Sequence, residues 1–168
     1  HARGLAEAAT QLGAACRVRG EGRRAISLTR RALATHEKTG DAEGVVGSLN
    51  DLAMLHLDVW EPGAALDCLE RARERNARVG EVRQTVRAEN GEAALRIAVH
   101  QPAARELRAT EALRLASIHR MRREEARAYR LLGLASLVRG ELDRAERYLN
   151  IALMVFGKTR SRIDEVEV

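Results

Sequence analysis

Small residues recur along this chain at intervals of 40 positions, and this repeat constrains the fold more than any other feature. Four series share the interval: Gly13, Ala53, Ala93 and Gly133; Ala25, Ala65, Arg105 and Ala145; Ala32, Ala72, Ala112 and Ala152; and Gly20, Trp60, His100 and Gly140. A fixed long period is typical of proteins in which one supersecondary unit is stacked several times. The sequence therefore predicts four copies of one unit, at about 2–40, 41–80, 81–120 and 121–160.

Each repeat is expected to hold two helices. Apolar residues recur at three- and four-residue steps, as Leu5, Leu12 and Cys16 do in the first segment, which is typical of an amphipathic helix. Glycine and proline stand where such segments stop and start. The predicted helices are 2–18, 23–38, 42–59, 62–79, 82–99, 102–119, 123–138 and 142–156. The short connections between them predict antiparallel helical hairpins.

Composition agrees with an all-α fold. The chain is 45% hydrophobic but only 2% aromatic, and it is rich in alanine and leucine rather than in the residues that strands favour. No interior linker divides it, so we predict a single domain over 1–168. Ser161 and Asp164 form a loose capping box, and 161–168 is predicted to begin a further helix or to cap the array. Because the chain begins with His1 rather than Met, we expect a fragment of a longer protein.

Charge is distributed unevenly along the sequence. The chain has 29 Lys and Arg against 24 Asp and Glu, a formal net charge of +5. The segment 41–70 holds acidic residues and no Lys or Arg, whereas 83–139 holds twelve Arg against six acidic residues. No apolar run is long enough to cross a membrane. Cys16 and Cys68 lack metal-ligand spacing, and we expect two buried thiols in a reducing, cytoplasmic setting.

Patterns typical of catalysis, cofactors or metals are missing from the sequence. The histidines lack the four-residue spacing of a zinc-binding helix, and Gly20-Glu21-Gly22 lacks the strand of a phosphate-binding loop. Glu124 and Glu125 are adjacent, so they lie on different faces of a helix. We therefore expect no enzyme activity, no cofactor and no metal.

Gly13, Ala25 and Ala32, with their counterparts at 40-residue intervals, have the mutual spacing of the small residues at positions 8, 20 and 27 of the tetratricopeptide repeat (TPR), which the chain therefore resembles. Two helices of a hairpin cross closely there, where a larger side chain would force them apart. The 40-residue length is similar to the long-helix variants of MalT- and AfsR-type bacterial regulators and of LGN-like scaffolds. The third repeat departs from the pattern at Glu92 and Arg105. The resemblance implies an all-α, right-handed superhelical stack of four helix-turn-helix repeats, whose first helices line a concave groove.

The same resemblance places the functional residues on the first helix of each repeat. The predicted partner-binding residues are Asn50, Met54, Leu57, Arg83, Arg87, Asn90, Arg123, Arg127 and Arg130. Asparagine amides can bond a peptide backbone, and arginine forks can hold carboxylates. We therefore expect a groove for an acidic or extended peptide. Two alternatives stay open: the polar residues form only the solvated side of each helix, and the apolar ones pack between repeats.

The expected function is a protein or peptide interaction scaffold, serving as the sensor or regulatory arm of a larger bacterial signalling or transcription regulator. One alternative is nucleic-acid binding through the Arg-rich second half, which the shortage of stacking aromatics disfavours. Another is a homo-oligomer in which the acidic repeat of one copy meets the basic repeats of the next.

Overall fold

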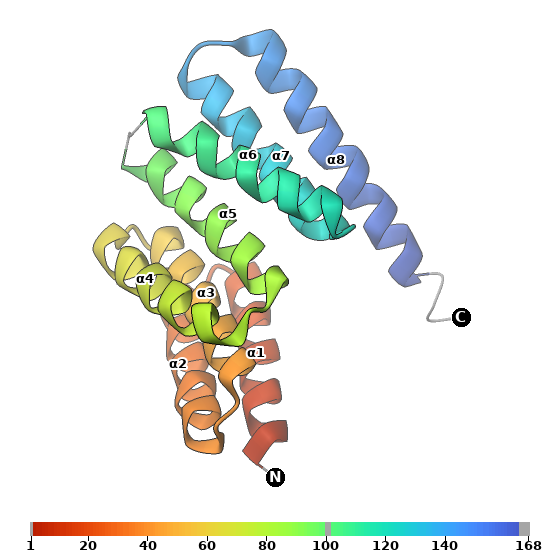
Figure 1. Cartoon of the computed structure of the whole chain (residues 1–168). Helices are drawn as coiled ribbons and strands as arrows, with labels where there is room; N and C mark the ends of the chain where they lie inside the picture. Colours follow the sequence, from red (N-terminus) through yellow and green to blue (C-terminus); the bar gives the residue numbers. More distant parts are fainter. Residues whose placement is uncertain (1, 100–101, 165–168) are drawn as a thin grey trace. The chain divides into compact units, whose positions relative to one another are not determined.

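A computed structural model describes residues 2–99 and 102–164, without the side chains of 3, 102–105 and 158–164 (Figure 1). This described part of the chain is all-α, with eight helices and no strand. The helices are α1 (Ala2–Val18), α2 (Gly22–Thr39), α3 (Ala42–Asp58), α4 (Pro62–Val79), α5 (Val82–Ala98), α6 (Pro102–Ile118), α7 (Arg122–Val138) and α8 (Leu142–Asp164). The all-α prediction is confirmed, and the helices lie where the sequence places them except at the end of α8.

The end of α8 differs from the prediction. The sequence predicted a stop at Phe156 and a new helix from Ser161, but α8 continues without a break to Asp164. The reason is that no proline or left-handed glycine interrupts the chain after Phe156, and Gly157 is itself helical. Residues 165–168 lie outside the described part.

The chain divides into two compact units, His1–Gly91 (unit 1) and Glu92–Val168 (unit 2), and the boundary falls inside α5. In unit 1, α1 packs against α2, α2 against α3, and α3 against α4. In unit 2, α6 packs against α7, and α7 against α8. Buried leucines and alanines fill both units: Leu49 and Leu69 are among the most buried side chains of unit 1, and Leu131 and Leu132 belong to the core of unit 2.

The turns between helices repeat one geometry every 20 residues. A residue with positive φ stands at each of six turns: Gly20, Gly40, Trp60, Gly80, Arg120 and Gly140. At five of these turns the next backbone N–H donates to the carbonyl oxygen five residues earlier, over 2.8–3.0 Å, as from Asp41 to His36. This is the Schellman arrangement, which satisfies helix-end carbonyls and favours glycine. The structural period is therefore half of the 40-residue sequence period.

The small residues of the repeat lie where helices approach closely. Of those in the series described above, the alanines on the second helices, Ala25, Ala32, Ala65, Ala72, Ala112, Ala145 and Ala152, are at most 3% exposed. A Cβ on Gly133 would lie 2.7 Å from Cγ of Leu149 and 3.4 Å from the carbonyl oxygen of Ala145. The predicted close approach is thus confirmed at these positions. Of the two departures in the third repeat, Glu92 is buried and pairs with Arg96, and the side chain of Arg105 lies outside the described part, as does His100.

The apolar stripe predicted for the first helix is wrong in part. Leu5 and Leu12 are 67% and 47% exposed, whereas Ala6 and Cys16 are buried. The buried face of α1 carries Ala6, Gly13 and Cys16, because α2 lies so close that a Cβ on Gly13 would stand 3.0 Å from Oγ1 of Thr29. Small residues therefore define the contact, and the two leucines point away from it.

Candidate functional site

Two predicted binding residues of unit 1 are engaged inside the protein. The Asn50 side chain is 2% exposed, and its Nδ2 donates to the backbone oxygen of Gln84 at 3.3 Å and to its Oε1 at 3.2 Å. Arg87 donates from Nη1 to the same Oε1 at 3.3 Å, and from Nη2 to Oδ1 of Asp51 at 2.5 Å. This network joins α3 to α5, so Asn50 is out of reach of a bound peptide.

The other predicted residues of unit 1 lie in varied surroundings. Met54 and Leu57 are half-buried on α3, Arg83 is exposed on α5, and Asn90 is 5% exposed. The burial of Met54, Leu57 and Asn90 fits packing between helices at least as well as contact with a ligand. Their role in binding stays a prediction.

In unit 2, the predicted residues all lie on α7. Nη1 of Arg127 donates to both carboxylate oxygens of Glu124, at 3.0 and 3.1 Å, while Arg123 and Arg130 are exposed. The residues predicted to line the groove belong to both units. A single groove that combines them remains a prediction.

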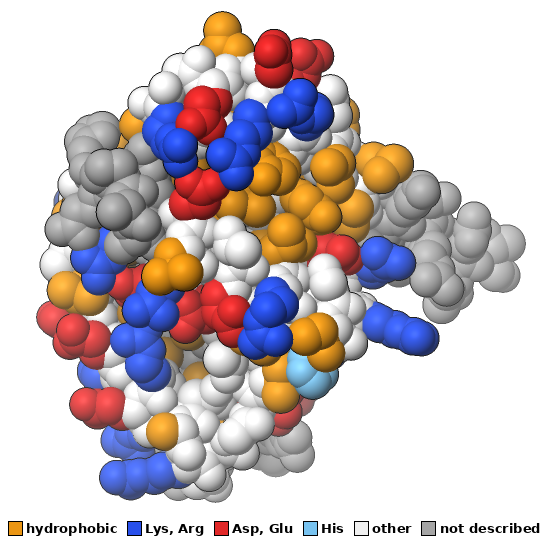
Figure 2. All heavy atoms as spheres, turned by 45° about the horizontal axis from the view of Figure 1, so that its top comes forward, with side chains coloured by type: hydrophobic (Ala, Val, Ile, Leu, Met, Phe, Trp, Pro, Cys, Tyr) orange, Lys and Arg blue, Asp and Glu red, His pale blue; other side chains and the backbone are white. Residues whose placement is uncertain are grey.

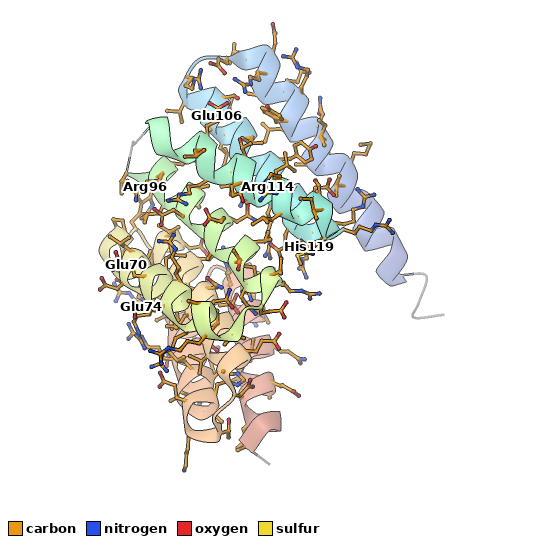
Figure 3. The ribbon with its side chains drawn as sticks, viewed as in Figure 1. Glu70, Glu74, Arg96, Glu106, Arg114 and His119 are labelled. Carbon is orange, nitrogen blue, oxygen red and sulfur yellow. The ribbon has the colours of Figure 1, made fainter. Side chains whose placement is uncertain are left out.

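Many arginines of the second half are neutralised by neighbouring carboxylates. Arg96 pairs with Glu92, Arg114 with Glu111, and Arg122 with Glu125, while Glu106 accepts hydrogen bonds from both Arg139 and Arg144. The labelled residues Arg96, Glu106 and Arg114 lie on α5 and α6 (Figure 3). On the face drawn in Figure 2, basic and acidic side chains lie beside one another rather than in separate fields. The arginine excess in the sequence therefore does not give this half an unopposed positive charge.

A pocket of about 280 Å³ in unit 1 is lined mostly by residues of α1, α3 and α5, the first helices of three repeats, together with His36 of α2 and Asp41. Each of α1, α3 and α5 contributes residues three or four positions apart, which lie on one helix face. The lining consists of Glu7, Thr10, His36, Asp41, Glu43, Gly44, Gly47, Ser48, Asp51, Gln84 and Arg87. We call this hollow the acidic pocket.

The acidic pocket is hollow because α3 presents little side-chain volume toward it. Gly44, Gly47 and Ser48 are spaced three and four positions apart on α3. A Cβ on Gly47 would come no closer than 3.5 Å to Gln84 and 3.7 Å to Arg87, so the space beside it is open enough for a methyl group. Gly47 thus leaves room that a larger residue would fill.

The charge of this pocket is negative. Four carboxylates line it, on Glu7, Asp41, Glu43 and Asp51, against one guanidinium, that of Arg87, which bonds Asp51. Carboxylates held together attract cationic groups and repel anionic ones. The first-helix face of unit 1 therefore suits a basic ligand, opposite in sign to the acidic peptide expected from the sequence.

The floor of the acidic pocket is held by a cap at the start of α3. Asp41 accepts a hydrogen bond from the backbone N–H of Gly44 at 2.9 Å through Oδ1, and its Oδ2 lies 2.8 Å from Nδ1 of the buried His36. A Cβ on Gly44 would stand 2.2 Å from that histidine nitrogen, so only glycine leaves the pair intact. The pocket is therefore built on fixed backbone rather than on a loop.

The 40-residue spacing carried a usable signal for this pocket. Glu7, Gly47 and Arg87 are each 40 positions apart, and all three line it. Asp41, Glu43 and Asp51 also line the pocket and are not among the binding residues predicted from the sequence. Their common feature is visible in the sequence, because they belong to the segment that has acidic residues and no Lys or Arg.

Other chemistry was sought in the same described residues. They contain no group of three or more His, Cys, Asp or Glu side chains placed to hold a metal ion, and no helix among them is both long and apolar enough to cross a membrane. Cys16 and Cys68 are buried free thiols, as predicted. Burial raises the pKa of the Cys68 thiol, against a smaller lowering by the nearby positive charge of Arg71.

Comparison with known proteins assigns no family to these features. The chain matches no protein-family model, and no curated protein matches it. The resemblance to the tetratricopeptide repeat therefore depends on residue spacing and on the helical hairpins themselves.

Proposed function

We propose that this chain is a TPR-like interaction scaffold that binds a basic, extended segment of a partner protein on the first helices of unit 1. The proposal keeps the function expected from the sequence, that of the partner-binding arm of a larger regulator acting by binding rather than by catalysis. It reverses the expected charge of the ligand. The observation that carries it is the acidic pocket, where Glu7, Gly47 and Arg87 of three successive repeats come together.

The size of the pocket suits one or two side chains rather than a whole ligand. Its volume of about 280 Å³ lies at or below the smallest typical small-molecule sites, which begin at about 300 Å³. A lysine or arginine side chain could enter beside Gly47 and place its charge among the carboxylates of Glu7 and Glu43. Such contacts mainly select the partner and speed its encounter. Further affinity would come from the rest of the partner segment.

Nucleic-acid binding through the second half is not the function we propose. The pairs of Arg122 with Glu125 and of Arg127 with Glu124 place a carboxylate beside each guanidinium on α7. A phosphate backbone would have to displace those carboxylates.

The test uses fluorescent twelve-residue peptides that are rich either in lysine and arginine or in glutamate. The basic peptide should bind to the whole chain, and the acidic peptide should not. Glu43→Gln removes one pocket charge, and Glu70→Gln removes one exposed charge on α4 as a matched control. Glu70 projects outward from α4 (Figure 3). We expect Glu43→Gln to weaken binding several-fold and Glu70→Gln to leave it unchanged.

A second pair of variants tests the hollow itself. Gly47→Gln would fill the acidic pocket, whereas Gly63→Gln adds the same side chain on α4, where nothing lies within 4 Å of a new Cβ. Binding should fall at least tenfold for Gly47→Gln alone. Equal affinity in both variants, with unchanged helicity, would contradict the proposed site. A preference for the acidic peptide would contradict the proposed ligand charge.

A further inference from the structure

A second pocket of unit 1 has the opposite charge. It encloses about 470 Å³ and is lined by Arg23, Ile26, Ser27, Arg30, Arg31, Ala34, His56 and Glu61. It shares no lining residue with the acidic pocket. Its volume lies within the range of about 300–1,000 Å³ that is typical of small-molecule sites. We call it the arginine pocket.

The arginine pocket is made by one face of α2. Arg23, Ser27, Arg30 and Ala34 follow one another at steps of four, three and four residues, which places them along one side of the helix. Arg31 lies next to this line, and Ile26 is buried at 7% exposure as an apolar part of the wall. The face therefore combines an apolar base with three cations and a hydroxyl group.

The three cations of the arginine pocket are not neutralised. Within the described residues, none of the guanidinium groups of Arg23, Arg30 and Arg31 has an ion-pair or hydrogen-bond partner. Their neighbour Arg24 differs, because its Nη1 donates to Oε2 of Glu21 at 3.0 Å.

The one carboxylate that lines the arginine pocket, that of Glu61, contacts the buried side chain of His56. Oε2 of Glu61 lies 2.7 Å from Nδ1 of His56, whose ring is 3% exposed. No hydrogen bond or ion pair joins Glu61 to the three arginines in the described structure. Glu61 is therefore engaged by His56 rather than by the guanidinium groups, and the lining holds three arginines against this one carboxylate.

We propose that the arginine pocket binds a small polyanion that carries a chain of two or three phosphate groups. Arginine forks bind phosphate oxygens through paired, charge-assisted hydrogen bonds. Arg23 and Arg30 are seven residues apart, which is about 10 Å along a helix axis. Guanidinium groups spread over that length match a di- or triphosphate chain better than a single phosphate. The hydroxyl group of Ser27, midway between them, supplies a further donor.

The binding test uses inorganic tripolyphosphate, and separately ATP without added metal, titrated calorimetrically into the whole chain at physiological salt. We expect saturable binding with one site per chain. Arg23→Ala and Arg30→Ala should each weaken it at least tenfold. Arg24→Ala is the matched control, because it removes the same charge from the same helix outside the pocket. It should change the affinity less than twofold.

The two probes distinguish possible sources of the phosphate chain. Equal affinities assign recognition to the phosphates alone, and tighter binding of ATP assigns a nucleotide. Absence of saturable binding would overturn the proposal, as would equal weakening by Arg24→Ala and Arg30→Ala in variants of unchanged helicity. Tighter binding of a single-stranded oligonucleotide through the same arginines would also overturn it. The Glu43 and Gly47 variants should leave tripolyphosphate binding intact, so failure of this site is distinguishable from failure of the peptide site.

Discussion

Replacing Gly40 with alanine should destabilise unit 1, whereas the same replacement at Gly63 should stabilise it. Both glycines are exposed in unit 1, and a Cβ added to either would meet nothing within 4 Å. The two differ in backbone conformation. Gly40 ends α2 with a φ of 70°, in the left-handed region, while Gly63 lies in the first turn of α4. The comparison therefore isolates conformation from packing.

The magnitudes follow from that difference. A left-handed conformation costs an L-residue about 1–2 kcal/mol, and alanine recovers about 0.4–1 kcal/mol by restricting the unfolded chain. Gly40→Ala should then lose about 1 kcal/mol. Gly63→Ala should gain about 0.5 kcal/mol, which is less than in a helix centre because it lies in the first turn. For a unit that spans His1–Gly91, the gap of about 1.5 kcal/mol corresponds to roughly 6–12 °C in Tm.

The measurement has to report on unit 1 alone, because two units need not unfold together. Amide hydrogen exchange, followed on peptides from α2 and α3, meets that need. Protection should fall in Gly40→Ala and rise in Gly63→Ala, relative to the unchanged chain. Changes of the same sign in both variants would refute the left-handed assignment at Gly40, and with it the shared turn geometry.

Three further changes have definite outcomes. Arg120→Gly should stabilise unit 2 by up to about 1 kcal/mol, measured by exchange in α6 and α7, because Arg120 holds a φ of 54°. Gly44→Ala should cost about 2 kcal/mol in urea unfolding, since its Cβ would stand 2.2 Å from the His36 ring and 2.5 Å from the Asp41 carboxylate that caps α3. Because burial raises the pKa of Cys68, its alkylation by iodoacetamide at pH 8 should be slower than that of free cysteine and should accelerate as the pH rises.

Spacing in the sequence was sufficient for the helices and for their close contacts. Alanine and glycine at 40-residue intervals identified the crossings of α1 with α2 and of α7 with α8, because only small residues permit such approach. The 40-residue spacing did not predict that the same turn conformation recurs at every twentieth residue. Two of these turns have Trp60 and Arg120 in place of glycine. Their φ is positive all the same, so the residue type at these positions does not reveal the shared backbone conformation.

The candidate site was predictable only in part. The register of Glu7, Gly47 and Arg87 pointed to one face, and these residues do share a pocket. Spacing in the sequence does not reveal whether a polar side chain is already hydrogen-bonded to a neighbouring helix. Asn50 on α3 bonds Gln84 on α5, and Arg87 on α5 bonds Asp51 on α3. The charge of Arg87 is thereby opposed by Asp51, which leaves the other carboxylates of the acidic pocket for a ligand.

Because the same turn recurs at every twentieth residue, it follows the first and the second helix of a hairpin alike. Removing a segment from just after Gly20 through Gly40 would leave one intact turn of the same kind. Every helix beyond it would then take the place of the other helix of its hairpin, so that α3 would have to pack as α2 does. Segments of twice that length preserve both the turns and these places. Viable changes of length in this chain should therefore come in whole hairpins, even though its turns would tolerate half of one.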